Sequence, residues 1–203
     1  MNEELLNRII EISKGIFIKY GVKSITMDDI SKQLGISKKT LYTVIKDKHD
    51  LIEKTSFAIS DQILETINDL LKKKLDPITE LLEIEKIVCD IVTGIDRSSI
   101  YQFQKFYPDI HKKLHDRQKE AIINMIKDNL RRGINDGLYR GDLNINFIAN
   151  IDYYFSHLLS DTDIFDPHEF DLRKIKHEYL IYHLRGIASY KGLSFIESKL
   201  REY

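Results

Sequence analysis

The stretch that decides the fold covers residues 24–48 and reads SITMDDISKQLGISKKTLYTVIKDK. Its large apolar residues return at helical spacing in two short runs, first Met27, Ile30 and Leu34, then Leu41 and Ile45. This periodicity is typical of amphipathic helices that bury one face. The stretch therefore predicts two short helices, at residues 27–34 and 37–45, with a tight turn between them.

Local end signals support the same two helices. Thr26, followed three residues later by Asp29, has the form of a capping box. Gly35 comes just after the first apolar run, where a left-handed conformation ends many helices. Ser37 is a favourable N-cap for the second helix. Both helices are thus predicted to begin with a side chain that satisfies free backbone N–H groups.

The second helix has an outward face that differs from its apolar back. Basic and hydroxyl-bearing side chains share this face at spacings of three and four residues: Lys39, Tyr42, Thr43 and Lys46. Lys38 and Thr40 join Lys39 in the first turn, the part of a recognition helix that reaches base edges. This layout is that of a helix-turn-helix, and it predicts entry into the major groove of DNA.

Positive charge is concentrated at the same end of the chain. From Lys14 to Lys48 there are eight lysines and three acidic residues, whereas the whole 203-residue chain has a net charge of −1. A nearly neutral chain with one basic end favours DNA binding by that end alone. An ordinary helix pair with solvated lysines is the alternative that spacing and charge leave open.

These residues resemble the DNA-binding domain of the TetR family of bacterial transcriptional regulators. The matching positions lie within residues 5–65 and include Ile16, Phe17, Tyr20, Gly21, 25–30, 34–37, 40–42, Lys46, Lys48 and Leu51. The family usually has Tyr or His, then Phe, where this chain has Val44 and Ile45. Ile45 keeps an apolar core role, whereas Val44 cannot donate a hydrogen bond to a phosphate.

The resemblance implies a helix-turn-helix from Asp28 to Asp47 and a set of DNA-binding residues. The whole set is Thr26, Ser37, Lys38, Lys39, Thr40, Tyr42, Thr43, Lys46 and Lys48. The expected groove contacts are Lys39, Thr40, Tyr42 and Thr43, with Tyr42 placed nearer a phosphate than a base. Thr26 and Lys48 are expected to anchor the DNA backbone, which adds affinity without sequence information.

Helical periodicity continues through the rest of the chain, so the expected fold class is all-α. Further helices are predicted at about residues 3–20, 48–73, 78–95, 98–107, 109–135, 146–159, 171–190 and 193–201. By the resemblance, residues 1–50 form a three-helix helix-turn-helix domain. Residues 51–203 then form an all-helical regulatory and dimerisation domain that binds a ligand.

A broad apolar stripe marks the segment at residues 146–159. Its members are Phe147, Ile148, Ile151, Tyr154, Phe155, Leu158 and Leu159. A stripe this wide can contact both its own core and a partner. In the family, this helix and the one at 171–190 form a four-helix interface between two subunits, although ordinary intrachain core is the alternative. A homodimer places two recognition helices about 34–36 Å apart, which implies a pseudo-palindromic operator in double-stranded DNA.

Family members commonly bind a small molecule in the C-terminal domain, so an unidentified small-molecule effector is expected. The side chains that could line its pocket are Tyr101, Phe103, Phe106, Tyr107, Met125, Tyr154 and Phe155. Core packing is the alternative for each of them. His111 and His115 lie four residues apart, but lysines separate them and no cysteine or third histidine is close in sequence. Neither a metal ion nor a cofactor is expected.

Other classes of protein are disfavoured by the sequence. It has no phosphate-binding glycine loop, zinc-protease motif, paired cysteines or nucleophile elbow, so no enzyme activity is expected. The chain has no long uncharged apolar run, so no membrane span is expected. Its N-terminus is charged, which disfavours a secretory signal, and its single cysteine, Cys89, fits a reducing compartment. These features favour a bacterial cytoplasmic protein. The expected function is a homodimeric repressor released by its effector; a ligand-independent, nucleoid-associated protein of the same fold is the alternative.

Overall fold

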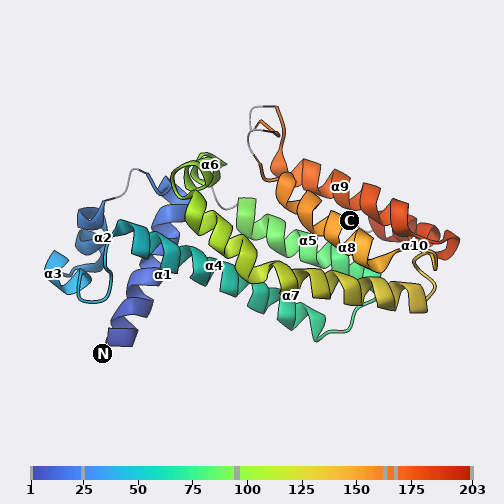
Figure 1. Ribbon diagram of the computed structural model, residues 1–203, viewed down its shortest axis with the longest axis horizontal. Coiled ribbons are helices and arrows are strands. Elements are labelled where there is room, and N and C mark those ends of the chain that lie inside the picture. Colours follow the sequence, from blue (N-terminus) through green and yellow to red (C-terminus); the bar gives the residue numbers. More distant parts are fainter. Residues whose placement is uncertain (1, 24–25, 94–96, 162–163, 167–168, 202–203) are drawn as a thin grey trace. The chain divides into compact units, whose positions relative to one another are not determined.

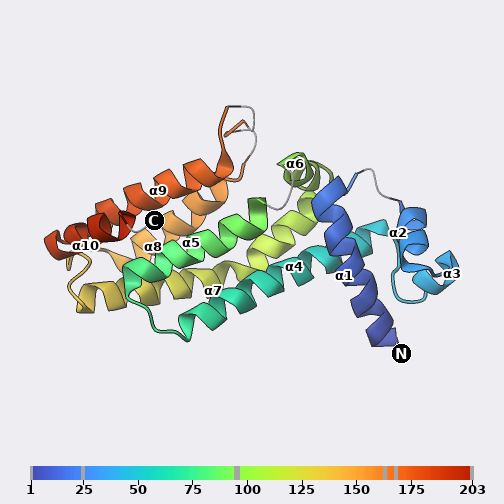
Figure 2. The same cartoon turned by 180° about the vertical axis from the view of Figure 1, so that it is seen from behind.

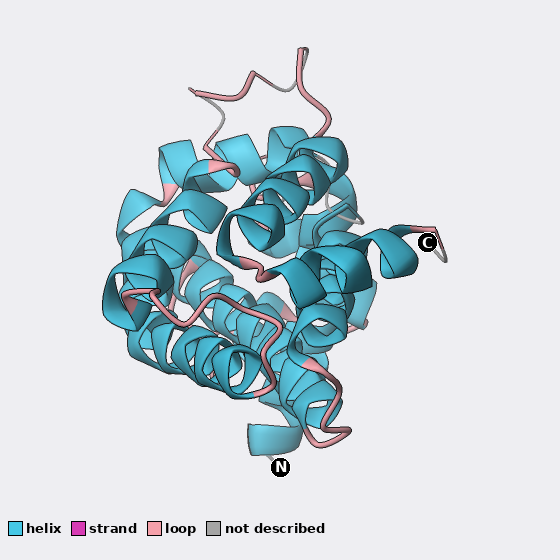
Figure 3. Ribbon diagram, turned by 90° about the vertical axis from the view of Figure 1, so that its right-hand side faces the viewer, coloured by secondary structure: helices cyan, strands magenta, loops and turns pink. Residues whose placement is uncertain are grey.

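The chain is described by a computed structural model at residues 2–23, 26–93, 97–161, 164–166 and 169–201. The described residues form helices joined by loops, with one isolated β-bridge between Tyr139 and Ala188 (Figures 1 and 3). The helices are α1 (Asn2–Tyr20), α2 (Met27–Leu34), α3 (Lys38–Leu41), α4 (Lys48–Leu71), α5 (Pro77–Thr93), α6 (Arg97–Phe106), α7 (Pro108–Asn135), α8 (Ile145–Leu158), α9 (Leu172–Ile187) and α10 (Tyr190–Leu200). None of these described helices is both long and apolar enough to cross a membrane.

The all-α prediction is confirmed, and only the recognition helix departs from its predicted limits by more than three residues. The helix predicted at 37–45 ends at Leu41, so that limit is wrong. Beyond it the backbone tightens, and the Val44 N–H bonds to the Leu41 carbonyl at 3.2 Å. The Thr43 hydroxyl donates to the Thr40 carbonyl at 2.6 Å, where a continuing helix would receive the Val44 N–H. The periodicity could not predict this competition.

The described helices pack as two compact units, each with its own core. The first unit consists of Met1–Glu65 and Ile91–Asp116, and the second consists of Thr66–Asp90 and Arg117–Tyr203. The division follows packing, so it does not test the functional boundary expected at residue 50. Each unit is therefore described by itself.

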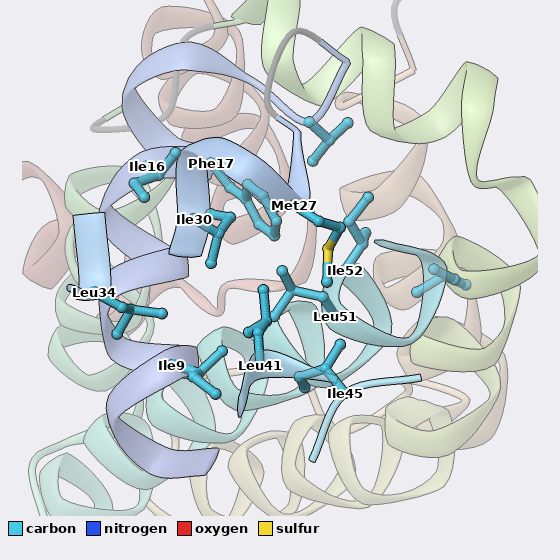
Figure 4. Close-up of a cluster of buried hydrophobic side chains, with 12 residues drawn as sticks. Ile9, Ile16, Phe17, Met27, Ile30, Leu34, Leu41, Ile45, Leu51 and Ile52 are labelled. Carbon is cyan, nitrogen blue, oxygen red and sulfur yellow. The ribbon is translucent and has the colours of Figure 1, made fainter. Parts of the chain in front are cut away.

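The first unit is built on one apolar cluster. Its buried members are Ile9, Ile16, Phe17, Val22, Met27, Ile30, Leu34, Leu41, Ile45, Leu51, Ile52 and Ile110. Figure 4 shows the labelled side chains of this cluster converging from several helices. The cluster contains every periodic apolar residue of the two motif helices, so their predicted inward faces are confirmed. Because α2 and α3 share a core with α1 and α4, packing sets the direction in which α3 presents its outer face.

The second unit contains a buried polar network between α5 and α7. The Glu80 carboxylate is only 2% exposed. It accepts a hydrogen bond from the Asn129 amide at 2.8 Å and pairs with the Arg132 guanidinium. The Tyr139 hydroxyl donates to the Asn129 carbonyl oxygen at 3.1 Å. The network gives partners to polar groups that would otherwise be unfavourable to bury.

In the second unit, α8 and α9 run side by side (Figures 1 and 2). One side of α8 buries Ala149 and Tyr153 in the core. Four apolar residues of its stripe remain exposed: Phe147, Ile151, Tyr154 and Phe155. Tyr179 of α9 stacks on Phe155, with 5.1 Å between the ring centroids, and donates to the Asp152 carboxylate at 3.0 Å. Helix α8 therefore packs one side in the core, and the four exposed members of the stripe form a second apolar side.

Candidate nucleic-acid interface

The start of α2 is held by the predicted capping box. The Asp29 N–H donates to the Thr26 hydroxyl oxygen at 3.2 Å, and the Thr26 N–H donates to the Asp29 carboxylate at 2.9 Å. Hydrogen bonds from the Thr26 side chain, then from its backbone, lower the pKa of the Asp29 carboxyl. Because the pKa of Asp29 is lowered in the folded state, the ionised Asp29 carboxylate stabilises the fold fully above the ordinary pKa of an aspartate. This stabilisation is lost as the pH falls through the lowered value.

Replacing Thr26 by alanine should therefore lower the free energy of unfolding by about 1 kcal/mol, the usual effect of removing an N-cap side chain. Urea titration of both proteins at neutral pH measures the difference. Thr26→Ser is the matched control, because it keeps the hydroxyl and should stay close to the original stability. Equal losses in the two variants would contradict the capping role.

The turn between α2 and α3 is held by the local conformation of Gly35 and by a contact from Arg8, which is distant in the sequence. Gly35 has φ +66° and ψ +29°, the left-handed conformation that was predicted to end α2. The Ile36 N–H returns to the Ser31 carbonyl at 3.0 Å. The Arg8 guanidinium of α1 donates to the Leu34 carbonyl at 3.1 Å, and so satisfies a free C=O at the end of α2. No pattern in the sequence pointed to Arg8.

Helix α3 and the residues just after it expose the side chains of the expected outer face. The Ser37 hydroxyl accepts the Thr40 N–H at 3.0 Å, which confirms the predicted N-cap. Leu41 and Ile45 are buried below this cap, and Val44 is half-buried against the same core. The exposed side chains are Ser37, Lys38, Lys39, Tyr42, Thr43 and Lys46. Lysine and hydroxyl groups and the Tyr42 ring are thus all exposed in this segment.

Two of the predicted DNA-binding lysines already make contacts within the unit. Lys38 pairs with Asp28 of α2. The Lys48 ammonium, at the start of α4, donates to the Lys23 carbonyl at 3.0 Å. Burial of part of this side chain lowers the pKa of Lys48, and the Asp29 carboxylate opposes that shift. Lys48 therefore ties α4 to the segment before α2.

Helix α6 also contacts the segment before α2. The Lys23 N–H donates to the Gln102 side-chain oxygen of α6 at 3.2 Å. A Cβ atom at Gly21, where φ is +73°, would lie 2.8 Å from the same oxygen. The Lys23 ammonium lies 5.0 Å from the centre of the Phe106 ring. No sequence pattern indicates Gln102, because 79 residues separate it from Lys23.

The seven residues expected to line an effector pocket are divided between the two units. Phe103 and Tyr107 pack against the core of the first unit, in which Tyr101 and Phe106 are partly exposed. The other three belong to the second unit: Met125 on α7, and Tyr154 and Phe155 on α8. Neither unit brings all seven together.

No protein-family model matches the chain. A curated HTH-type transcriptional regulator of Staphylococcus aureus strain bovine RF122 / ET3-1 is 36% identical over 83 residues, or 41% of this chain and 43% of that protein. A second HTH-type transcriptional regulator, from S. aureus strain USA300, is 47% identical over 49 residues, or 24% of this chain and 26% of that protein. The matches thus span less than half the length of these curated relatives.

Solved structures resemble the described chain over most of its length. A transcriptional regulator from Cytophaga hutchinsonii has a TM-score of 0.73 at 17% identity, covering 91% of this chain and 98% of its own. A TetR-family regulator from Agrobacterium tumefaciens has a TM-score of 0.69 at 16% identity, covering 93% and 100%. A regulator from Saccharomonospora viridis, solved in complex with choline, has a TM-score of 0.72 at 15% identity, covering 92% and 99%. The chain therefore has the all-helical fold of the TetR family of transcriptional regulators, which confirms the resemblance drawn from the motif residues.

Proposed function

We propose that this chain is a sequence-specific DNA-binding transcriptional regulator that reads the major groove with α3 and the turn after it. The observation that carries the proposal is the geometry of the motif. Capped α2, the Gly35 turn and capped α3 share one core, and the opposite face exposes Lys39, Tyr42, Thr43 and Lys46. Exposed cations can neutralise phosphates while neighbouring side chains approach base edges.

The regulator acts as a homodimer through α8 and α9 in this proposal. Support comes from the four exposed apolar residues of α8, since Phe147 is 59% exposed and Ile151 42%. On α9, Tyr182 is 77% exposed. A contiguous exposed apolar surface commonly marks an interaction site. Two copies joined there would present two recognition surfaces to a pseudo-palindromic operator.

We further propose that the output is repression, and that a small molecule bound outside the helix-turn-helix releases the operator. The neighbour from S. viridis, solved with choline, supports the view that this fold can hold a small ligand. To release DNA, the effector must bind the non-binding conformation more tightly than the DNA-binding one. The proposal places the protein in the bacterial cytoplasm, where it meets its operator.

Selection of binding sites from random duplexes with the purified chain, at stated salt concentrations, tests the proposal. We expect one enriched pseudo-palindrome, bound at least about a thousandfold more tightly than unrelated duplexes. Binding without sequence preference would instead support the nucleoid-associated alternative. No binding to duplex DNA even at low salt would refute both.

Replacing Lys46 by alanine should weaken binding about equally on all sequences. The plot of log affinity against log salt concentration should become shallower by about one for each half-site, because one phosphate contact is lost per copy. Fluorescence anisotropy over a salt series measures this slope. Lys86→Ala, which removes an exposed lysine of α5, is the control and should leave the slope unchanged. An unchanged slope in the Lys46 variant would remove Lys46 from the phosphate-contacting set.

A further inference from the structure

The hydroxyl groups of Ser37, Thr40 and Thr43 in the proposed DNA-reading segment form hydrogen bonds with one another or with the backbone. The Ser37 and Thr40 hydroxyl oxygens lie 2.8 Å apart and share one hydrogen bond. The Thr43 hydroxyl donates to the Thr40 carbonyl at 2.6 Å. A hydroxyl has a single hydrogen, so Thr43 has no donor left in this arrangement. It keeps two acceptor lone pairs and its methyl group.

Because its hydroxyl hydrogen is already used within the chain, Thr43 can contact a base only as a hydrogen-bond acceptor or through its methyl group. Thr43 is exposed, directly after Tyr42, and lies four residues after Lys39 and three residues before Lys46. The Thr43 hydroxyl is bonded to the Thr40 carbonyl. The methyl group is therefore the part of the side chain that remains for an apolar contact with a base. Guanine shows only acceptors in the major groove, and an acceptor-only hydroxyl cannot bond to them. Thymine shows a 5-methyl group, which suits contact with another methyl.

We propose that Thr43 determines specificity by placing its methyl group against the 5-methyl group of a thymine, at one A·T pair in each half-site. The inference rests on the proposed function, because it names the base that the same surface reads. The committed hydroxyl disfavours guanine at this position, and the methyl contact favours thymine. Lys39 and Lys46 remain the long cationic side chains beside it.

The test begins with the site selected by the original chain. Each thymine is replaced in turn by deoxyuridine, symmetrically in both half-sites, which removes the 5-methyl group and nothing else. The binding of four proteins is compared: the original chain, Thr43→Val, which keeps the methyl shape, Thr43→Ser, which keeps only the hydroxyl, and Lys46→Ala as a phosphate-contact control. Thermal melting verifies that all four are folded.

At one thymine position we expect deoxyuridine to weaken the original chain about fourfold per half-site, the effect of losing one buried methyl-sized contact. Thr43→Val and Lys46→Ala should keep this penalty, and Thr43→Ser should lose it. The inference is overturned if no thymine shows a penalty, if Thr43→Ser keeps it, or if Thr43→Val loses it as Thr43→Ser does. If selection enriches no site at all, the proposed function fails as well, whereas an enriched site without the penalty refutes only the role of Thr43.

Discussion

Replacing Arg132 by methionine should destabilise the second unit by roughly 3 kcal/mol, the lower part of the range for breaking a buried ion pair. Arg132 pairs with Glu80, whose side chain is only 2% exposed, and the guanidinium also donates to the Leu75 carbonyl at 3.2 Å. Methionine replaces the apolar stem but leaves the carboxylate buried without a cation. We expect the lower part of that range because the Arg132 side chain is 40% exposed, so water weakens its attraction to Glu80. Urea unfolding at one fixed protein concentration measures the change, since self-association would otherwise affect the result.

The adjacent residue provides a matched control. Arg131 pairs with Asp128, but both side chains are more than half exposed, so Arg131→Met should change the free energy of unfolding by less than about 1 kcal/mol. A second variant tests the cause. Adding Glu80→Gln to Arg132→Met should recover part of the loss, because the neutral amide keeps an acceptor for Asn129. If the double variant is no more stable than Arg132→Met alone, burial of an unpaired charge is not the cause.

Replacing Ile151 by lysine should convert the proposed dimer into monomers and reduce operator affinity by about a hundredfold or more, the typical loss when two linked binding events become one. Ile151 lies between Phe147 and Phe155 on the exposed apolar side of α8. A lysine at that position would place a charge in the proposed interface, which strongly disfavours association. Light scattering gives the mass, and anisotropy with the selected operator gives the affinity.

The control for this experiment is Leu193→Lys. Leu193 lies on α10, outside the proposed interface, and is 36% exposed, close to the 42% of Ile151. The control should remain dimeric and keep its affinity. An original chain that is monomeric, or an Ile151 variant that stays dimeric with full affinity, would contradict the proposed interface.

Much of the motif could be predicted from sequence because its signals are local. The capping box of Thr26 and Asp29 and the left-handed Gly35 depend on residues within one helical turn. The inward positions Leu41 and Ile45 follow from periodicity alone. The end of α3 could not be predicted in the same way. It depends on whether the Val44 N–H bonds to the Thr40 carbonyl, as in a continuing α-helix, or to the Leu41 carbonyl, as here, where the Thr43 hydroxyl bonds to the Thr40 carbonyl.

The candidate effector residues show a second limit of pattern reasoning. An aromatic residue at helical spacing is predicted to face something apolar, but the pattern does not say what. Phe103 and Tyr107 face the core that also holds α2 and α3, and Phe155 stacks on Tyr179 while remaining partly exposed. The choice between core, pocket and partner depends on which helix lies opposite.

Within the motif, the amino-acid sequence by itself determined where the two helices begin, their caps, their buried faces and the basic outer surface, because each depends on neighbours a few residues away. Only the tertiary structure decided the contacts between distant positions. Arg8 reaches the turn after α2, Gln102 holds the backbone of Lys23, and Arg132 neutralises Glu80. These pairs are 26, 79 and 52 residues apart, and a local period carries no information about a partner that packing alone brings near.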